Sequence, residues 1–347
     1  MLDQHTRNKE KFPIETVRAV AIIILVSFHV IGGPDGRGLG LDAMHPLRYY
    51  ADLLVDLRMP LFAFIAGLVY AKRPVSTNNL GKFLRGKFRR LAIPGAVAMS
   101  LFALTAIMTG AASQPPDPVW MMYFSGYSIF WFLQAILVIF FTAVVADIIS
   151  KGKLLLPMLV GSIFAICFGF TFTSEIMSLD RVTSLLPYFL IGVFFIRNHN
   201  FIMGKKNILI PAFFIIMLTG LIMNFYVLGQ TGSFSEDRLD LQSFLFGAGA
   251  CTISIMIFPT IDYLRFIGSY SFTIYLYHIF ATTGSRKALA SLELDSPYLH
   301  LFFGLILGVG LPIILHFLIA KNRFLSQLML GINYQDKTSR PKQLRTA

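Results

Sequence analysis

The chain has 347 residues, of which 55% are hydrophobic and only 14% are charged, and its net charge is +12. An ordinary soluble domain carries about 25% charged residues, so this composition excludes a soluble globular protein and favours one that is solvated largely by lipid. The positive charges stand in short loops between apolar runs rather than on one polar face, which excludes nucleic acid as the expected partner.

Ten apolar stretches of near-membrane length predict about ten transmembrane helices, and none shows the strict alternation of a membrane barrel strand. They cover residues 17–33, 52–71, 91–110, 127–149, 154–172, 182–197, 207–228, 241–260, 266–284 and 299–320. If the N-terminus is cytoplasmic, most of the 30 Lys and Arg residues face the cytoplasm, so both termini are expected there. We therefore expect an all-α polytopic membrane domain over residues 1–330 and a disordered cytoplasmic tail over residues 331–347.

The first predicted helix carries Arg18 near its cytoplasmic end and His29 eleven residues later. Eleven residues are close to three helical turns, so the two side chains share a face and lie about 16 Å apart along the axis. An ionisable side chain at membrane depth is costly and therefore points to function. The alternative is a histidine that only hydrogen-bonds a neighbouring helix.

The second predicted helix carries Arg58, fourteen residues from the cytoplasmic Lys72 and so about 21 Å from it along the axis. Arg58 is a candidate substrate-binding residue. The alternative is a structural ion pair with Asp56 or Asp52 at the outer end of the helix.

A basic cluster precedes the third predicted helix and includes Lys87, Arg89 and Arg90. Guanidinium groups bind phosphate oxygens in pairs, so the cluster is a candidate docking site for a phosphorylated ligand. Attraction to anionic lipid explains the same charges equally well.

The fourth predicted helix contains Trp131 and Gln134, and the ninth contains Tyr275 and His278. An aromatic face with an amide or hydroxyl beside it suits a sugar ring, although an interfacial aromatic belt has the same composition. His278 lies about 20 Å along its helix from the cytoplasmic Arg265. His29, Arg58 and His278 are thus predicted to fall in one layer near the middle of the membrane.

Five stretches in chain order resemble the membrane-bound acyltransferase family 3, which contains bacterial O-acyltransferases of surface polysaccharides. The stretches are Ile14–Ile22 continuing to His29, Met59–Gly67, Lys87–Pro94, Trp131–Leu133 and Phe266–His278. Ala63 and Ala66 stand where the family more often has Phe and Ser, and Lys87 stands where it often has Arg. The chain resembles the stand-alone form, which has no extracytoplasmic hydrolase-like domain.

The resemblance implies transfer of an acyl group, with acetyl as the first expectation, from cytoplasmic acyl-CoA to a hydroxyl of a cell-surface or exported glycan, in a bacterial inner membrane. Arg18, Lys87, Arg89 and Arg90 would meet the donor phosphates. His29 would be the general base, or would carry the acyl group, because the unperturbed pKa of an imidazole is about 6.5. His278, Tyr275 and Arg58 would stabilise the oxyanion or orient the acceptor.

No permanently bound cofactor or metal is expected, because the histidines lack ligand spacing on one helix. Two other classes of protein fit the same polar layer. One is a transporter or flippase of a glycan or small polar solute, although no pair of Gly- or Pro-broken helices occurs in two matching halves. The other is a sensory or structural membrane protein in which the histidines only pack.

Overall fold

The structure is a computed structural model that describes residues 12–33, 37–73, 75–234 and 239–332. In these residues the regular structure is helical, and two single residues, Ser125 and Ile176, form an isolated β-bridge. The α-helices are α1 (Ile14–Ile31), α2 (Pro46–Leu53), α3 (Val55–Ala71), α4 (Leu80–Lys87), α5 (Ile93–Thr109), α6 (Trp131–Ser150), α7 (Leu155–Cys167), α8 (Leu179–Arg197), α9 (His199–Gly204), α10 (Lys206–Thr231), α11 (Leu241–Ile257), α12 (Asp262–Ser269), α13 (Ser271–Ser291), α14 (Pro297–Ile319) and α15 (Arg323–Leu330).

The prediction of an all-α polytopic membrane protein is confirmed, and each predicted apolar segment falls on a helix. Seven helical stretches of the described chain are long and apolar enough to cross a membrane. The predicted count of ten is not confirmed, because α7 and α11 are shorter apolar helices and the ninth segment is divided at Tyr270 between α12 and α13. The seven stretches are Ile14–Ile31, Pro46–Ala71, Thr77–Thr109, Ser128–Ser150, Leu179–Arg197, Lys206–Thr231 and Pro297–Ile319.

Contacts between helix ends support the predicted alternation of direction. The C-terminal ends of α3, α6 and α8 meet where Asp147 accepts hydrogen bonds from Tyr70 at 2.8 Å and from Arg197 at 2.6 Å. The opposite end of the bundle joins Ser27 of α1 to Tyr50 of α2 at 3.1 Å. Which end faces the cytoplasm stays a prediction, and the outermost terminal residues lie outside the described chain.

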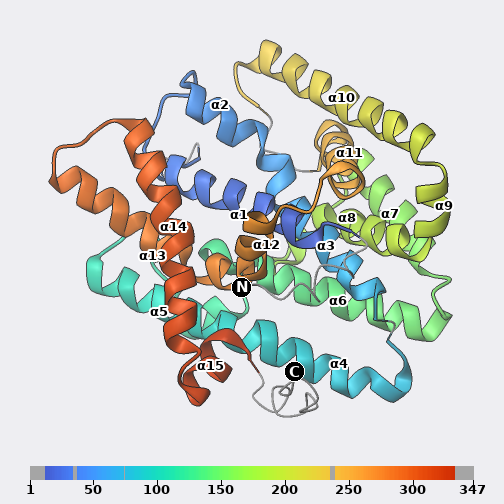
Figure 1. Cartoon of the computed structure of the whole chain (residues 1–347), viewed down its shortest axis with the longest axis horizontal. Coiled ribbons are helices and arrows are strands. Elements are labelled where there is room, and N and C mark those ends of the chain that lie inside the picture. The colour runs from blue at the N-terminus through green and yellow to red at the C-terminus, as the bar shows by residue number, and fades with distance from the viewer. Residues whose placement is uncertain (1–11, 34–36, 74, 235–238, 333–347) are drawn as a thin grey trace, which may run out of the picture.

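Helix α1 lies at the centre of the molecule, between α3, α12, α13 and α14 (Figure 1). Its apolar window is 67% buried within the protein, whereas that of α10 is only 11% buried. Figure 1 shows α10 at the rim of the bundle. Most side chains of α1 therefore face protein, while most apolar side chains of α10 are left for lipid.

Two glycines allow α3 and α8 to pack with their backbones in contact. A Cβ atom at Gly67 of α3 would overlap the carbonyl of Phe189, and one at Gly192 of α8 would overlap the carbonyl of Phe64. Small residues at a helix crossing are the usual way in which membrane helices approach closely. This contact sets the position of α3, which carries Arg58 at its other end.

Candidate active site

Helix α1 holds Arg18 and His29 on one continuous element. The helix runs without interruption from Ile14 to Ile31, so the predicted separation of about 16 Å along its axis stands. His29 lies in the last turn and is partly exposed. Arg18 lies in the second turn and pairs with both carboxylate oxygens of Glu15 at 2.7 Å.

The structure brings His29 against His278 of α13, with the two ring centroids 4.9 Å apart. His278 is fully buried, and its Nδ1 lies 2.9 Å from the carbonyl oxygens of Ile274 and Tyr275. Carbonyls only accept hydrogen bonds, so the proton of the neutral ring is on Nδ1. Its Nε2 is buried and has no hydrogen-bond partner among the described residues. The second nitrogen of His278 is therefore a proton acceptor beside the ring of His29.

Arg58 completes the predicted polar layer. It is 4% exposed, and its guanidinium carbon lies 3.2 Å from the centroid of the Phe28 ring, which in turn contacts the ring of His29. Arg58 and Arg37, which lies in the loop after α1, are both near enough to His29 for their positive charges to interact with its ring electrostatically. A guanidinium held against an aromatic face keeps a fixed orientation.

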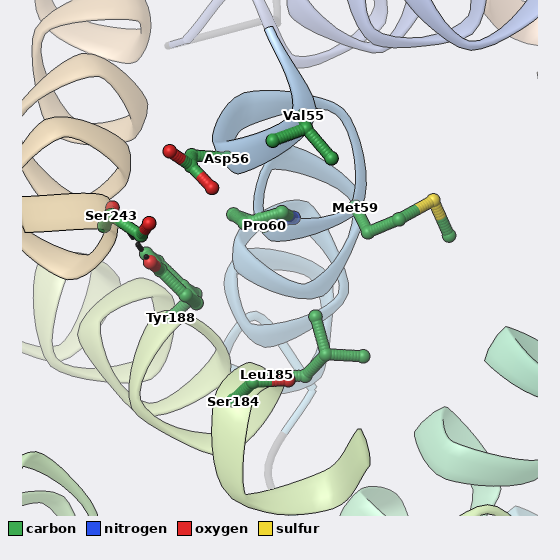
Figure 2. A pocket seen from close by; sticks show the side chains of 8 residues that line it. All are labelled: Val55, Asp56, Met59, Pro60, Ser184, Leu185, Tyr188 and Ser243. Atoms are coloured by element: carbon green, nitrogen blue, oxygen red, sulfur yellow. Dashed lines mark hydrogen bonds between the residues drawn. The ribbon is translucent and has the colours of Figure 1, made fainter. Parts of the chain in front are cut away.

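Of the two carboxylates proposed to neutralise Arg58, Asp52 forms an ion pair with Arg48 at 2.8 Å. Asp56 accepts a hydrogen bond from Asn224 of α10 at 3.2 Å. Asp56 also borders a small cavity, where Figure 2 shows it on the same side of α3 as Tyr188 and Ser243. Neither histidine borders this cavity, so it lies beside the candidate active site rather than within it. Its lining consists of Val55, Asp56, Met59, Pro60, Ser184, Leu185, Tyr188 and Ser243.

Gln134 and Tyr275 hold the segment that leads into α6. Gln134 is 4% exposed, its amide nitrogen donates to the carbonyl of Tyr123 at 3.1 Å, and its amide oxygen accepts from Ser178 at 2.9 Å. The Tyr275 hydroxyl donates to the carbonyl of Ile129. Both polar groups are therefore engaged within the protein, although the Tyr275 ring still lies 6.5 Å from that of His278.

Trp131 stands apart from the histidines, at the start of α6. It is partly exposed, and the guanidinium carbon of Arg181 lies 5.6 Å from its ring centroid. Contact of this partly exposed ring with a sugar stays a prediction.

The basic cluster of Lys87, Arg89 and Arg90 lies partly at the end of an α-helix and partly in a π-helical turn. Lys87 ends α4 and directs its Nζ onto the ring of Phe140, at 3.3 Å from the centroid. Arg89 and Arg90 lie in a π-helical turn, Phe88–Ala92, that separates α4 from α5. π-Helical turns occur mostly as single insertions within α-helices, frequently at functional sites. Arg89 is partly buried and Arg90 is exposed, so the two guanidinium groups leave the turn in different environments.

Sequence reasoning missed Phe28 and Asn224 as parts of this region. Phe28 had no polar signal, and only its place next to His29 could have suggested a contact with Arg58. Asn224 is a buried polar residue within an apolar helix, a pattern that by itself points to an internal partner. Among the described residues, no group of three or more His, Cys, Asp or Glu side chains could hold a metal ion.

One comparison with known proteins finds a relationship. A family model described as an acyltransferase domain matches residues 13–317, which include α1, the basic turn and most of α14. No curated protein and no solved structure matches the chain.

Proposed function

Because the chain belongs to acyltransferase family 3 and is a multi-pass membrane acyltransferase, we propose that it moves an acyl group, with acetyl as the first expectation, from cytoplasmic acyl-CoA to a hydroxyl of an exported glycan. The proposed location is a bacterial inner membrane, with the basic ends of the helices on the cytoplasmic side. The family favours an enzyme over the transporter and the purely structural protein that the sequence left open.

The observation that carries the proposal is the pair of imidazoles, His29 and His278, within the helix bundle. A sugar hydroxyl is a weak nucleophile at neutral pH and needs a base that removes its proton during attack. His29 is partly exposed and can meet a substrate, whereas His278 is fully buried. We therefore assign the base to His29 and its orientation to His278, whose Nε2 can accept a hydrogen bond from the His29 ring.

The reaction then proceeds in two steps. The acceptor hydroxyl gives its proton to His29 while its oxygen bonds to the thioester carbonyl carbon, which forms a tetrahedral oxyanion. The carbon–sulfur bond breaks, and His29 returns the proton to the departing thiolate, leaving an ester and free CoA. Arg58 is positively charged and packs on the ring of Phe28, which in turn contacts His29. Arg58 is therefore the candidate to stabilise the oxyanion. Direct acylation of His29 before the acceptor attacks uses the same residues.

The donor phosphates are proposed to meet Arg18, Lys87, Arg89 and Arg90, on the side opposite the outer loops. The π-helical turn supports this assignment because it places two arginines in succession at the start of α5. Trp131 is proposed to contact the acceptor. Gln134 and Tyr275, whose polar groups are engaged with the loop before α6, are proposed to shape that side of the site rather than to bind the sugar.

The test is acyl transfer by purified protein in lipid nanodiscs, with mass spectrometry of the glycan. We expect His29→Ala to reduce turnover by about 10²–10⁴-fold, the usual contribution of general acid–base catalysis. His316→Ala is the matched control, since this histidine also lies on a membrane helix but bonds Thr273 at 2.8 Å, away from the pair. Wild-type turnover in His29→Ala would contradict the assignment of His29 as the base. Acylation of a different acceptor would contradict the proposal that the acceptor is a glycan.

A further inference from the structure

The short helix α15 follows the last long helix and packs beside α5 (Figure 1). Asn322 caps its first turn by accepting a hydrogen bond from the backbone nitrogen of Leu325 at 3.1 Å. Ser326 and Leu330 form its buried face, with 0% and 8% exposure. The helix ends at Gly331, which has a φ of +65°. An eight-residue helix of this kind is stabilised by what it packs against, because its own hydrogen bonds are too few.

The end of α15 lies directly on the arginine turn. A Cβ atom at Gly331 would be 2.7 Å from the carbonyl oxygen of Arg89 and 2.8 Å from the Cα of Arg90. Both atoms belong to the backbone, so neither can move aside as a flexible side chain would. The left-handed conformation of Gly331 adds a second reason for glycine, since other residues adopt it at a cost.

The same end of α15 also contacts α13, the helix that carries His278. The hydroxyl of Tyr277, the residue before His278, donates a hydrogen bond to the carbonyl of Met329 at 3.1 Å. Tyr277 is 4% exposed, so the hydrogen bond is shielded from competing solvent. Residues 329–331 thus join the arginine turn to α13.

We propose that the end of α15 positions the Arg89–Arg90 turn for the phosphates of acyl-CoA, and that Gly331 is the positioning residue. A π-helical turn has less favourable geometry than the α-helix on either side, so it depends on its neighbours to keep its shape. Gly331 packs directly against the backbone of this turn. The hydrogen bond from Tyr277 to Met329 fixes the end of α15, and with it Gly331, relative to α13. This inference rests on the proposed function for the identity of the ligand.

The test compares Gly331→Ala with Gly232→Ala. Gly232 also ends a helix, with a φ of +75°, but a Cβ there would meet nothing within 4 Å. The conformational cost of the two substitutions is therefore alike, and only the contact with the arginine turn differs. The probe is coenzyme A, titrated by calorimetry into protein in nanodiscs, together with its analogue that lacks the 3′-phosphate.

We expect Gly331→Ala to weaken coenzyme A binding by about tenfold, the effect of one charge-assisted phosphate contact, and Gly232→Ala to bind as wild type. The loss should shrink for the analogue without the 3′-phosphate, a difference that general damage to the fold would not produce. Tyr277→Phe, which removes only the hydroxyl, should weaken binding in the same direction and keeps the test decisive if Gly331→Ala does not fold.

Wild-type affinity in both Gly331→Ala and Tyr277→Phe would overturn the inference, as would an equal loss with both ligands. Failure of the proposed function looks different: the wild-type protein would then bind coenzyme A without acylating a glycan, or would not bind it at all.

Discussion

At the scale of single residues, the two neighbouring imidazoles have different surroundings. His278 is fully buried and its Nδ1 is held by two carbonyls of its own helix, so its ring cannot turn freely. His29 lies in the last turn of α1, is partly exposed and has the charges of Arg37 and Arg58 nearby. The fixed ring is suited to orient its neighbour, and the accessible ring is suited to meet the substrate.

This division of roles predicts a non-additive pair of substitutions. We expect His278→Ala to lower turnover by about 10–100-fold with a smaller change in KM, because only the orientation of the base is lost. In His29→Ala the base is already absent, so adding His278→Ala should cost little more. Steady-state kinetics of both single variants and the double variant measure this. Effects that simply multiply would show that the histidines act independently.

At the scale of helices, close backbone contacts place the elements that carry the site. The α3–α8 crossing depends on Gly67 and Gly192, each of which faces a backbone carbonyl of the other helix. Because α3 also carries Arg58, a shift at this crossing would move the guanidinium relative to Phe28 and His29. The position of Arg58 therefore depends on a crossing at Gly67, two to three helical turns further along α3.

Gly67→Ala and Gly192→Ala are each expected to destabilise the protein by about 1–3 kcal/mol, the usual cost of overpacking, and to lower activity in the fraction that folds. Thermal unfolding in detergent, followed by intrinsic fluorescence, would measure this. Gly161→Ala in α7 is the control, since a Cβ at Gly161 meets nothing within 4 Å and alanine favours the helix. Equal melting temperatures for all three variants would show that the α3–α8 contact is not tight.

At the scale of the whole molecule, contacts between helix ends and the distribution of charge identify the same end of the bundle. Tyr70, Asp147 and Arg197 join the C-terminal ends of three helices, and Lys and Arg are concentrated in the loops at that end. On the same side, the backbone nitrogen of Ile261 bonds the hydroxyl of Thr16 at 3.2 Å. The excess of positive charge predicts that this end is the cytoplasmic one.

The orientation predicts opposite labelling of two exposed positions, Lys82 and Ala112. In a variant whose exposed Cys167 is replaced by alanine, Ala112→Cys should react with a membrane-impermeant maleimide in intact cells. Lys82→Cys should react only after the cells are permeabilised. Cys251 is buried and serves as an internal background. The reverse pattern would place the basic turn outside and would remove cytoplasmic acyl-CoA as the donor.

The sequence by itself determined the features that depend on local pattern. Apolar length predicted the helices, and the rise per residue predicted that His29, Arg58 and His278 would share a layer. The structure brings these three together. Depth in the membrane follows from position along a single helix, so it needs no knowledge of which helices are neighbours.

Only the tertiary structure decided which side chains meet across the bundle. In the structure His29 contacts His278, and the side-chain amide of Gln134 hydrogen-bonds Ser178 and the loop before α6. Gly331 packs against the arginine turn. The structure also divides the ninth apolar segment at Tyr270, where hydropathy showed one continuous run. The physical reason is that contacts between distant segments depend on crossing angles and on the rotation of each helix about its axis. These are set by packing between helices, and neither hydropathy nor spacing within one helix records them.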